Sequence, residues 1–330
     1  MVTVLMPFRD AAATIAAAAE SILRQVDVDL VLVAVDDGSS DDSRERLDSF
    51  DDPRLTVVEN RGPSGIVGAL ETARALVSSP WIARMDADDL AHPRRLARQL
   101  DQARGPGRPD VVGCGVCLVD SCGEGMTRYV EWANSLTDAA DISRSRFVEC
   151  PLIHPSALIR ADALDGVGGY RDVPWAEDHD LWLRMLEAGC RFEKVPEVLL
   201  DWRDSSHRLT RRDPRYGDEA RMAMRCQFLM RQPAVAERGV SIAGAGPIGK
   251  RLARGLMQLG GTVRGFFEVN PRRIGERIHG VPVVGSDEVG TRWRESVLLG
   301  AVGVPGARER VRRIAVEAGR VEGEDFWSVC

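Results

Sequence analysis

The segment Trp81-Ile82-Ala83-Arg84-Met85-Asp86-Ala87-Asp88-Asp89 joins an apolar run of strand character to three carboxylates. Like charges this close repel one another, and burying them unpaired at the end of a strand is unfavourable. A divalent cation removes that penalty, since Mg²⁺ and Mn²⁺ prefer oxygen ligands and often bind carboxylates together with substrate phosphates. The segment therefore predicts a metal that links the protein to a diphosphate. The alternative is a solvated acidic turn that caps a helix near Pro93.

Strands and helices alternate around this segment. Four apolar runs have the length of strands: residues 2–6, 30–35, 55–59 and 81–85. Helical patterns lie between them, and this alternation predicts βαβ units and a parallel sheet. In open α/β sheets, ligands bind at the carboxyl ends of the strands. Asp36–Asp37 and Asp86–Asp89 both follow such ends, which favours the metal over the acidic turn.

Length and composition indicate an ordinary globular protein. The chain has 330 residues, of which 44% are hydrophobic and 28% charged, and this length allows two domains. No apolar run approaches a membrane span, and the start of the chain shows no signal peptide. We therefore expect a cytoplasmic protein without a transmembrane segment.

Seven cysteines, an odd number in a long chain, favour reduced thiols over a disulfide framework. Cys114, Cys117 and Cys122 have the spacing of half a zinc site. Because no second ligand pair lies near them, we favour free thiols.

Charge is distributed unevenly along the chain. From Arg231 onward the sequence holds 16 basic and 11 acidic residues, whereas the preceding residues hold 28 and 39. This asymmetry is typical of two domains of different origin. No dense basic run interleaved with aromatic residues is present, so the composition argues against nucleic-acid binding.

Six short motifs follow one another in an order that resembles the inverting family 2 glycosyltransferases of the GT-A fold. They are Pro-Phe-Arg-Asp at 7–10, Asp-Asp-Gly-Ser-Ser-Asp-Asp at 36–42, Met-Asp-Ala-Asp-Asp at 85–89, His-Pro-Ser-Ala-Leu-Ile-Arg at 154–160, Gly-Gly-Tyr-Arg at 168–171 and Ala-Glu-Asp-His-Asp-Leu-Trp-Leu-Arg at 176–184. The resemblance covers residues 1–215. It implies an α/β fold of the GT-A type, a mixed sheet with helices on both faces, in a domain spanning residues 1–230.

On the donor side, the resemblance implies that Asp37 accepts a hydrogen bond from the base of the donor nucleotide. The loop of Pro7, Phe8, Arg9 and Asp10 would line the same pocket, with Asp86 beside it. Asp86 and Asp88 match the acid-x-acid motif, which implies Mn²⁺ or Mg²⁺ held by both residues, with Asp88 favoured as the direct ligand and His207 as a candidate third one.

On the acceptor side, Asp178 matches the family's catalytic base. An inverting transfer needs one carboxylate to take the proton of the acceptor hydroxyl, and a helix N-terminus favours the ionised form of that carboxylate. The alternative is that Glu177 and Asp178 only cap a helix. Other residues placed near the substrates are His154, Gly169, Trp175 and Glu177 on the acceptor side, and Arg203 and Arg208 as phosphate contacts. His154 could equally be a packed core histidine.

The last part of the chain predicts a second domain, residues 239–330, after a linker at 231–238. Gly244, Gly246 and Gly249 form a G-x-G-x-x-G between a predicted strand and a predicted helix, and Glu268 follows the next strand. A dinucleotide-binding fingerprint requires this order of strand, glycine-rich loop and helix. In such a fingerprint the acidic residue after the next strand binds a ribose hydroxyl. The region resembles the small Rossmann-like domains attached to sugar-modifying enzymes. A nucleotide-type ligand, a purely structural role and NAD-linked redox chemistry are the three alternatives.

The sequence thus predicts a metal-dependent inverting glycosyltransferase that uses a nucleotide-diphosphate sugar, with a UDP-linked donor favoured. Its acceptor would be a saccharide or glycolipid in cell-surface polysaccharide or glycoconjugate synthesis. Peripheral membrane association and a homo-oligomer are both compatible with the sequence. A nucleotidyltransferase and a nucleotide-sugar sensor without turnover are the alternatives. Residues 105–145 match no motif, so the sequence leaves the choice of acceptor open.

Overall fold

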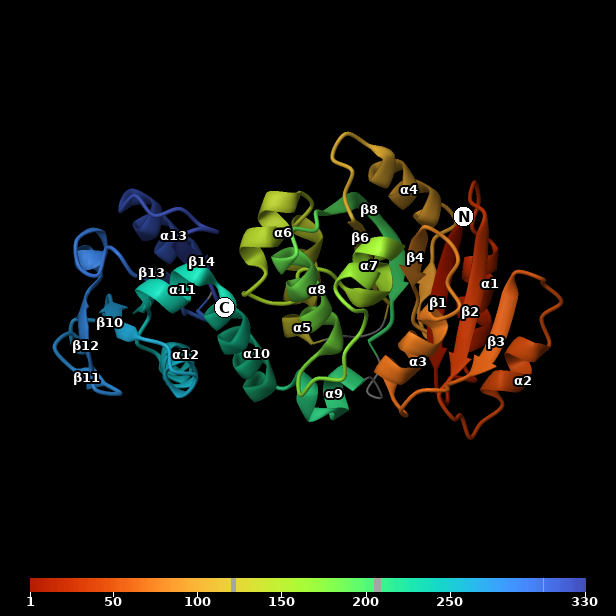
Figure 1. The fold of residues 1–330 in the computed structure, drawn as a ribbon, viewed down its shortest axis with the longest axis horizontal. Coiled ribbons are helices and arrows are strands. Elements are labelled where there is room, and N and C mark those ends of the chain that lie inside the picture. Colours follow the sequence, from red (N-terminus) through yellow and green to blue (C-terminus); the bar gives the residue numbers. More distant parts are fainter. Residues whose placement is uncertain (120–122, 205–208, 305) are drawn as a thin grey trace. The chain divides into compact units, whose positions relative to one another are not determined.

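The computed structural model describes residues 1–119, 123–204, 209–304 and 306–330 (Figure 1). Two compact units divide the chain. The first comprises residues 1–142, 152–173 and 177–212, and the second comprises residues 143–151, 174–176 and 213–330. None of the helices described has both the length and the apolar character that a membrane span requires.

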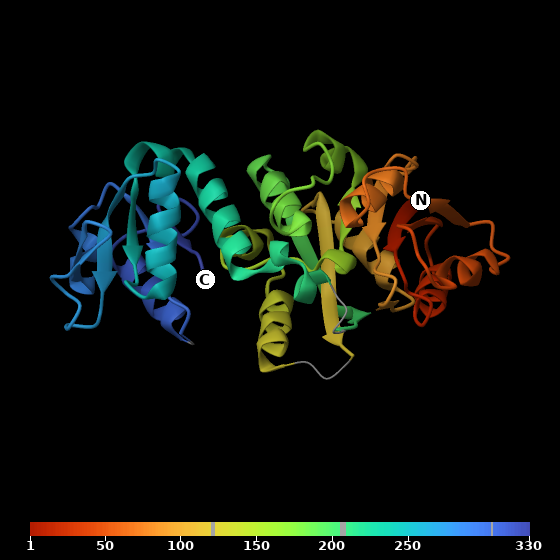
Figure 2. The same cartoon turned by 90° about the horizontal axis from the view of Figure 1, so that it is seen from below.

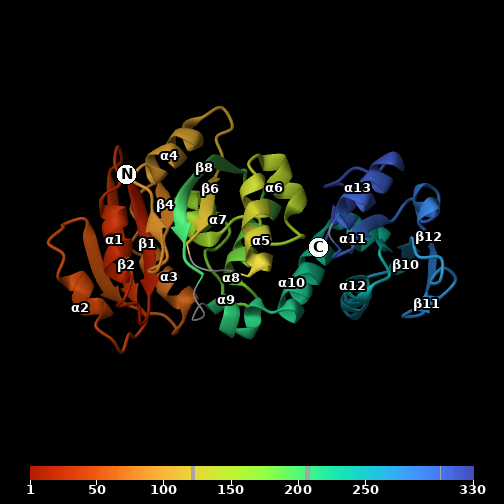
Figure 3. The same cartoon turned by 180° about the vertical axis from the view of Figure 1, so that it is seen from behind.

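An eight-stranded mixed sheet forms the centre of the first unit, and Figures 1 and 3 give opposite views of it. Its strands, in spatial order, are β3 (Leu55–Glu59), β2 (Leu30–Asp36), β1 (Val2–Phe8), β4 (Trp81–Arg84), β7 (Leu158–Arg160), β6 (Val111–Leu118), β8 (Phe192–Trp202) and β5 (Leu90–Ala91). The first four named are mutually parallel, which confirms the predicted βαβ arrangement there. β7 runs antiparallel to both of its neighbours, so the whole sheet is mixed, as the GT-A resemblance implied.

Alternating side chains of β1 explain how helices cover the sheet. Val4 and Met6 join one buried cluster with Ile22 of α1 and Leu100 of α4. Leu5 between them is equally buried, and because successive strand residues face opposite sides it points to the other face. The helices of this unit are α1 (Ile15–Leu23), α2 (Ser43–Asp48), α3 (Ile66–Arg74), α4 (Arg95–Arg104), α5 (Glu124–Ser135), α6 (Ala139–Ser145, which ends in the second unit), α7 (Ala161–Gly166), α8 (Glu177–Glu187) and α9 (Leu209–Arg212), with a 3₁₀ turn at His154–Ser156.

The second unit contains a six-stranded sheet. Its spatial order is β11 (Arg277–Ile278), β12 (Val281–Gly285), β10 (Val263–Glu268), β9 (Val240–Ala243), β13 (Val297–Gly300) and β14 (Phe326–Ser328). Apart from β11, all neighbouring strands pair in parallel. Without β11 the order is that of a Rossmann fold, with the topological switch point between β9 and β13. This arrangement agrees with the predicted Rossmann-like domain.

Helices accompany this second sheet, and Figure 2 shows α12 running beside its strands. They are α10 (Asp218–Arg231), α11 (Pro233–Arg238), α12 (Pro247–Gln258) and α13 (Ala307–Glu317), with 3₁₀ turns at Pro214–Tyr216 and Ser286–Gly290. α10 packs tightly on α12, since a Cβ on Gly255 would lie 2.7 Å from the Cys226 sulfur. The segment predicted as a linker, residues 231–238, consists largely of helix α11, and α10 groups with this unit.

The described cysteines form no disulfide. Six of them are free: Cys114, Cys117, Cys150, Cys190, Cys226 and Cys330. Cys114 is buried and Cys117 is exposed, while Cys122 lies outside the described residues. The two described members of the C-x2-C-x4-C motif are therefore free thiols.

Two helical glycines of the first unit give a matched test of packing. A Cβ on Gly68 in α3 would lie 1.8 Å from the carbonyl oxygen of Pro63, whereas a Cβ on Gly125 in α5 would meet no atom within 4 Å. We expect Gly68→Ala to lower the free energy of unfolding by about 1–3 kcal/mol through overpacking. Gly125→Ala should raise it by up to about 1 kcal/mol through helix propensity. Urea denaturation measures both, and equal effects of the two substitutions would contradict this account of α3.

Candidate active site

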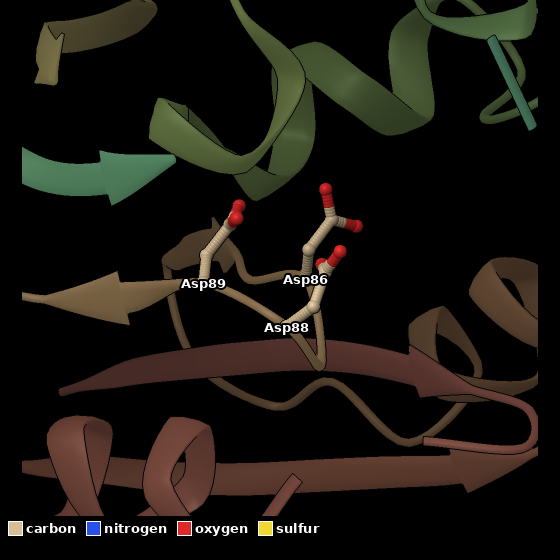
Figure 4. A group of neighbouring side chains, drawn as sticks. All are labelled: Asp86, Asp88 and Asp89. Atoms are coloured by element: carbon tan, nitrogen blue, oxygen red, sulfur yellow. The ribbon is translucent and has the colours of Figure 1, made fainter. Parts of the chain in front are cut away.

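Three carboxylates converge directly after β4. The side-chain oxygens of Asp86, Asp88 and Asp89 that could ligate a metal lie within 4.8 Å of one another, and the side chains project to the same side of their loop (Figure 4). The loop begins beside β1, because the Met85 N–H donates to the Leu5 carbonyl at 3.1 Å. An all-carboxylate set of oxygen donors with this spacing fits Mg²⁺ or Mn²⁺.

The three aspartates differ in how the protein holds them. Asp89 is 1% exposed, and its Oδ1 accepts the Arg203 backbone N–H at 2.9 Å, which ties the loop to the end of β8. Asp86 forms an ion pair with Arg84. Asp86 and Asp88 are only partly buried. Asp89 therefore anchors the loop, and Asp86 and Asp88 are the better candidates for holding a metal.

Arg203 has a role in this loop that sequence reasoning missed. Besides its backbone contact with Asp89, its Nε donates to the Asp88 carbonyl at 3.1 Å. The predicted phosphate contact of Arg203 stays a prediction. The predicted metal ligand His207 and the predicted phosphate contact Arg208 lie outside the described residues.

A second polar cluster lies at the ends of β1 and β2. Both oxygens of Asp37 accept the Gly65 N–H, at 3.0 and 2.9 Å, and Oδ1 also accepts Asn60 Nδ2 at 2.6 Å. The Asp37 N–H donates to the Phe8 carbonyl at 2.9 Å, which joins the two strand ends. Sequence reasoning missed Asn60 and Gly65, although an Asn followed by glycines after the third strand was a usable signal.

The loop after β1 supplies the rest of this cluster. Arg9 Nη1 lies 3.9 Å from Asp37 Oδ2 and 3.5 Å from the Ser64 hydroxyl. Asp10 adopts a left-handed backbone, and its Oδ1 accepts the Ser40 N–H at 2.7 Å and the Ser40 hydroxyl at 3.0 Å. These two hydrogen bonds from Ser40 lower the pKa of Asp10. The residues predicted around the donor base, 7–10 and Asp37, therefore lie together at one edge of the sheet.

Asp178 lies in the first turn of α8, as its sequence context predicted. Its Oδ1 accepts the His179 N–H at 2.7 Å, and the adjacent Glu177 is 2% exposed. Burial, and after it the negative charge of Glu177, raises the pKa of Asp178 to about 7. A carboxylate with a pKa near neutral is suited to act as a general base, because it is both ionised and basic at working pH.

The Gly168–Gly169 turn and His154 lie beside α8. Both glycines have positive φ, and Arg184 of α8 donates to the Gly169 carbonyl at 2.9 Å. His154 is buried, and its Nε2 lies 3.1 Å from the Tyr170 hydroxyl. Burial, with the positive charge of Arg84 second, lowers the pKa of His154 well below its usual range, so the ring is neutral. The packed-histidine alternative thus accounts for the position of His154, and its predicted contact with acceptor stays a prediction.

Trp175 belongs to the short segment 174–176 that groups with the second unit. Its predicted acceptor contact, like those of Gly169 and Glu177, stays a prediction.

The glycine-rich loop of the second unit follows β9. Gly244 has φ +111°, and a Cβ there would lie 2.7 Å from the Ala301 carbonyl oxygen. A Cβ on Gly249 would lie 1.9 Å from the Gly244 carbonyl oxygen, so α12 packs closely on the loop. Gly246 differs, because a Cβ there would meet nothing within 4 Å and its φ is an ordinary −73°. Glu268 at the end of β10 accepts the Ala245 N–H at 3.2 Å.

Comparisons with known proteins agree with this geometry. The family described as "Glycosyl transferase family 2" matches residues 3–168, about half of the chain. EpsE of Bacillus subtilis (strain 168) is 29% identical over 222 residues, which cover 65% of this chain and 77% of EpsE. ExoU of Rhizobium meliloti (strain 1021), a succinoglycan biosynthesis protein, is 32% identical over 212 residues, which cover 59% of each chain.

Two solved structures share the fold. TarS of S. aureus in complex with UDP-GlcNAc aligns with a TM-score of 0.56 at 14% identity, covering 70% of this chain and 66% of that one. The mannosyltransferase PcManGT of Pyrobaculum calidifontis in complex with GDP-Man and Mn²⁺ aligns with a TM-score of 0.50 at 22% identity, covering 77% and 68%.

The mixed sheet, with acidic side chains at its carboxyl edge, therefore has the GT-A fold. Within that class, the chain belongs to glycosyl transferase family 2.

The pKa of Asp178 predicts how stability depends on pH. A carboxyl group whose pKa is raised from 3.8 to about 7 by folding stabilises the protein fully below pH 4, and this stabilisation is lost as pH rises to about 7. We expect Asp178→Asn to become progressively more stable than wild type between pH 4 and 7. The difference should level off above pH 7, at a gain on the order of 4 kcal/mol. Urea unfolding at each pH measures it, and a difference independent of pH would contradict the assignment.

Proposed function

We propose that the first unit transfers a sugar from a nucleotide-diphosphate sugar to a hydroxyl acceptor, with inversion at the anomeric carbon. One observation carries the proposal. The acidic loop at Asp86–Asp89 groups carboxylate oxygens that could bind a metal, and the same unit holds Asp178, a buried carboxyl at the start of α8 whose pKa is raised to about 7. A candidate metal site and a candidate base are the two parts that such a transfer needs.

The donor nucleotide would occupy the pocket at the ends of β1 and β2. Asp37 would accept a hydrogen bond from the base, with its carboxylate oriented by Asn60 and Gly65. Residues 7–10 would close the pocket beside it. A UDP-linked donor is favoured; TarS was solved with UDP-GlcNAc, whereas PcManGT was solved with GDP-Man.

Asp88, with Asp86, would hold Mn²⁺ or Mg²⁺ against the diphosphate. When bound, the ion offsets the negative charge that grows on the leaving diphosphate. Asp89 and Arg203 keep the loop in place for this task. His207 and Arg208 would complete the phosphate side.

Asp178 would act on the acceptor. Its carboxylate takes the proton of the acceptor hydroxyl as that oxygen bonds to the anomeric carbon. The bond from this carbon to the diphosphate oxygen breaks on the opposite face of the sugar, and the electron pair leaves with the diphosphate. Glu177, Gly169 and His154 would lie on the acceptor side of the site, and the acceptor contact of Trp175 stays a prediction.

The relatives' names suggest a biological setting. ExoU is named for succinoglycan biosynthesis, and AmsE of Erwinia amylovora is an amylovoran biosynthesis glycosyltransferase. We propose that this chain also serves polysaccharide or glycoconjugate synthesis, with a saccharide or glycolipid acceptor. Its free thiols support action in a reducing compartment such as the cytoplasm.

For the second unit we propose a nucleotide-type ligand at the switch point between β9 and β13. Gly244 and Gly249 are needed for the packing of the protein itself, but Gly246 is not, since a Cβ there would meet open space. A glycine at this position is explained by a ligand whose phosphates approach the backbone. Glu268 at the end of β10 would accept the ribose hydroxyls.

Two substitutions test glycosyl transfer. Asp178→Asn should reduce kcat by at least about 100-fold, because it removes the base without changing the shape of the side chain. Asp88→Asn should abolish the Mn²⁺-dependent increase in melting temperature with UDP. A screen of nucleotide-sugars with and without Mn²⁺, followed by product analysis with candidate acceptors, measures both effects. Transfer at the wild-type rate in either variant would reject the proposal, and UDP binding without any turnover would favour a sensor.

Gly246→Ala tests the ligand of the second unit. The substitution should leave the melting temperature of the ligand-free protein unchanged but weaken nucleotide binding at least 10-fold, because the new methyl group occupies the space of the phosphates. Calorimetric titrations with NADH and with UDP-GlcNAc measure the binding. Gly290→Ala, at an exposed position of the same unit where a Cβ makes only ordinary contacts, is the control. Lack of binding by wild type would leave the unit with a structural role.

A further inference from the structure

Asp37, in the polar cluster at the ends of β1 and β2, is surrounded by hydrogen-bond donors. Its Oδ1 accepts Asn60 Nδ2 at 2.6 Å, and both of its oxygens accept the Gly65 N–H. A cation also faces it, since Arg9 Nη1 lies 3.9 Å from Oδ2. These groups suit a carboxylate that acts only as an acceptor. A carboxylate has about four acceptor positions, so Asp37 keeps capacity for an N–H of a ligand.

Asn60 is fixed in one orientation by hydrogen bonds at both ends of its amide. Nδ2 donates to Asp37 and, at 2.9 Å, to the Pro63 carbonyl. Oδ1 accepts the Gly62 N–H at 2.8 Å and the Thr72 hydroxyl at 3.0 Å. Turning the amide over would place its N–H groups against two donors and its oxygen against two acceptors. The amide of Asn60 therefore presents a donor, and not an acceptor, to Asp37.

Thr72 of α3 sets the direction of this chain of hydrogen bonds. Its Oγ1 accepts the Arg61 N–H at 3.1 Å, and its single hydroxyl hydrogen goes to Asn60 Oδ1. The adjacent residue of the same helix has a different partner, because Glu71 Oε1 accepts the Tyr170 N–H at 2.7 Å. Of these two neighbours on α3, it is Thr72 that is bonded to the partner of Asp37.

We propose that Thr72 and Asn60 are positioning residues that determine base specificity: their directed hydrogen bonds hold Asp37 as an acceptor only, so the site selects nucleotides whose base carries a ring N–H. Uracil and guanine have such an N–H on their pairing edge, whereas cytosine and adenine have a lone pair there. A lone pair facing the carboxylate is repelled and leaves the carboxylate without its hydrogen bond. The nucleotide's position beside Asp37 is that of the proposed function, on which this inference rests.

Matched pairs of nucleotides isolate the contribution of the base. UDP and CDP differ only in the base, so contacts of the ribose, the diphosphate and any metal cancel in the ratio of their dissociation constants. GDP and ADP form a second pair. Calorimetric titration of the full chain in the presence of Mn²⁺ measures both ratios. We expect wild type to favour UDP or GDP in its pair by at least about 10-fold, the effect of one charge-assisted hydrogen bond.

Substitutions at two positions test the chain of hydrogen bonds. Thr72→Val keeps the shape but removes the hydroxyl, and the ratio should fall about 5-fold because Asn60 loses one bond that fixes its amide. Thr72→Ser keeps the hydroxyl and should retain the wild-type ratio. Asn60→Asp keeps an acceptor for Thr72 but turns a second carboxylate oxygen toward Asp37. The resulting repulsion should bring the ratio close to one.

Glu71→Gln is the matched control on the same helix. It weakens the ion pair with Arg74, whose Nη2 lies 2.6 Å from Glu71 Oε2, and should lower the melting temperature while leaving the ratio unchanged. An unchanged ratio in Thr72→Val or in Asn60→Asp would overturn the proposal. So would a fall in Glu71→Gln as large as the one in Thr72→Val.

The titrations also separate this inference from the proposed function. Equal binding of both members of each pair by a wild type that transfers sugar would overturn the inference and leave the proposed function standing. Base selection that is lost in Thr72→Val, without sugar transfer to any acceptor, would refute the proposed function and leave the inference standing. Binding of none of the four nucleotides would refute both.

Discussion

The concentration of negative charge at the carboxyl edge of the first sheet is the constraint on which the catalytic unit depends. Asp86, Asp88 and Asp89 lie on one short loop, with Asp89 fully buried. Such a loop is stable only if each carboxylate has a partner. The Arg203 backbone N–H holds Asp89, and Arg84 pairs with Asp86. In the function proposed above, the same loop would hold a cation against the donor diphosphate.

The region around Asp178 follows the opposite principle. Asp178 is buried beside Glu177, and its pKa rises to about 7. This arrangement is unfavourable for stability and favourable for taking up a proton at neutral pH. Hydrogen bonds nearby, such as the one from Arg184 to the Gly169 carbonyl, hold the Gly168–Gly169 turn against α8. Contacts of this kind compensate for the loss of stability that the burial of Asp178 causes.

The second unit has a sheet of its own. Its strand order matches half of a Rossmann fold. The tightly packed glycines after β9 and the acidic Glu268 at the end of β10 occupy the positions expected in such a fold. The matched family region ends at residue 168, before this unit's main body begins. The chain therefore combines a family 2 catalytic fold with a small α/β unit whose chemistry has to be argued from its own residues.

The sequence alone determined the local parts of this protein. Apolar runs of strand length predicted the parallel strands β1 to β4 and, in the second sheet, β9 and β10, because burial on both faces requires continuous hydrophobic segments. It also identified the Asp86–Asp89 loop, the position of Asp178 at the start of α8 and the glycine-rich loop, since each depends on residues that are close in the chain.

Only the tertiary structure decided which distant groups act on one another. That Arg203 ties down Asp89 and that Asn60 and Gly65 orient Asp37 both depend on contacts between separate elements. It likewise showed that His154 is a buried neutral partner of Tyr170 and that residues 231–238 contain a helix. Burial and long-range charge set these outcomes, and neither can be read from the spacing of residues along a chain.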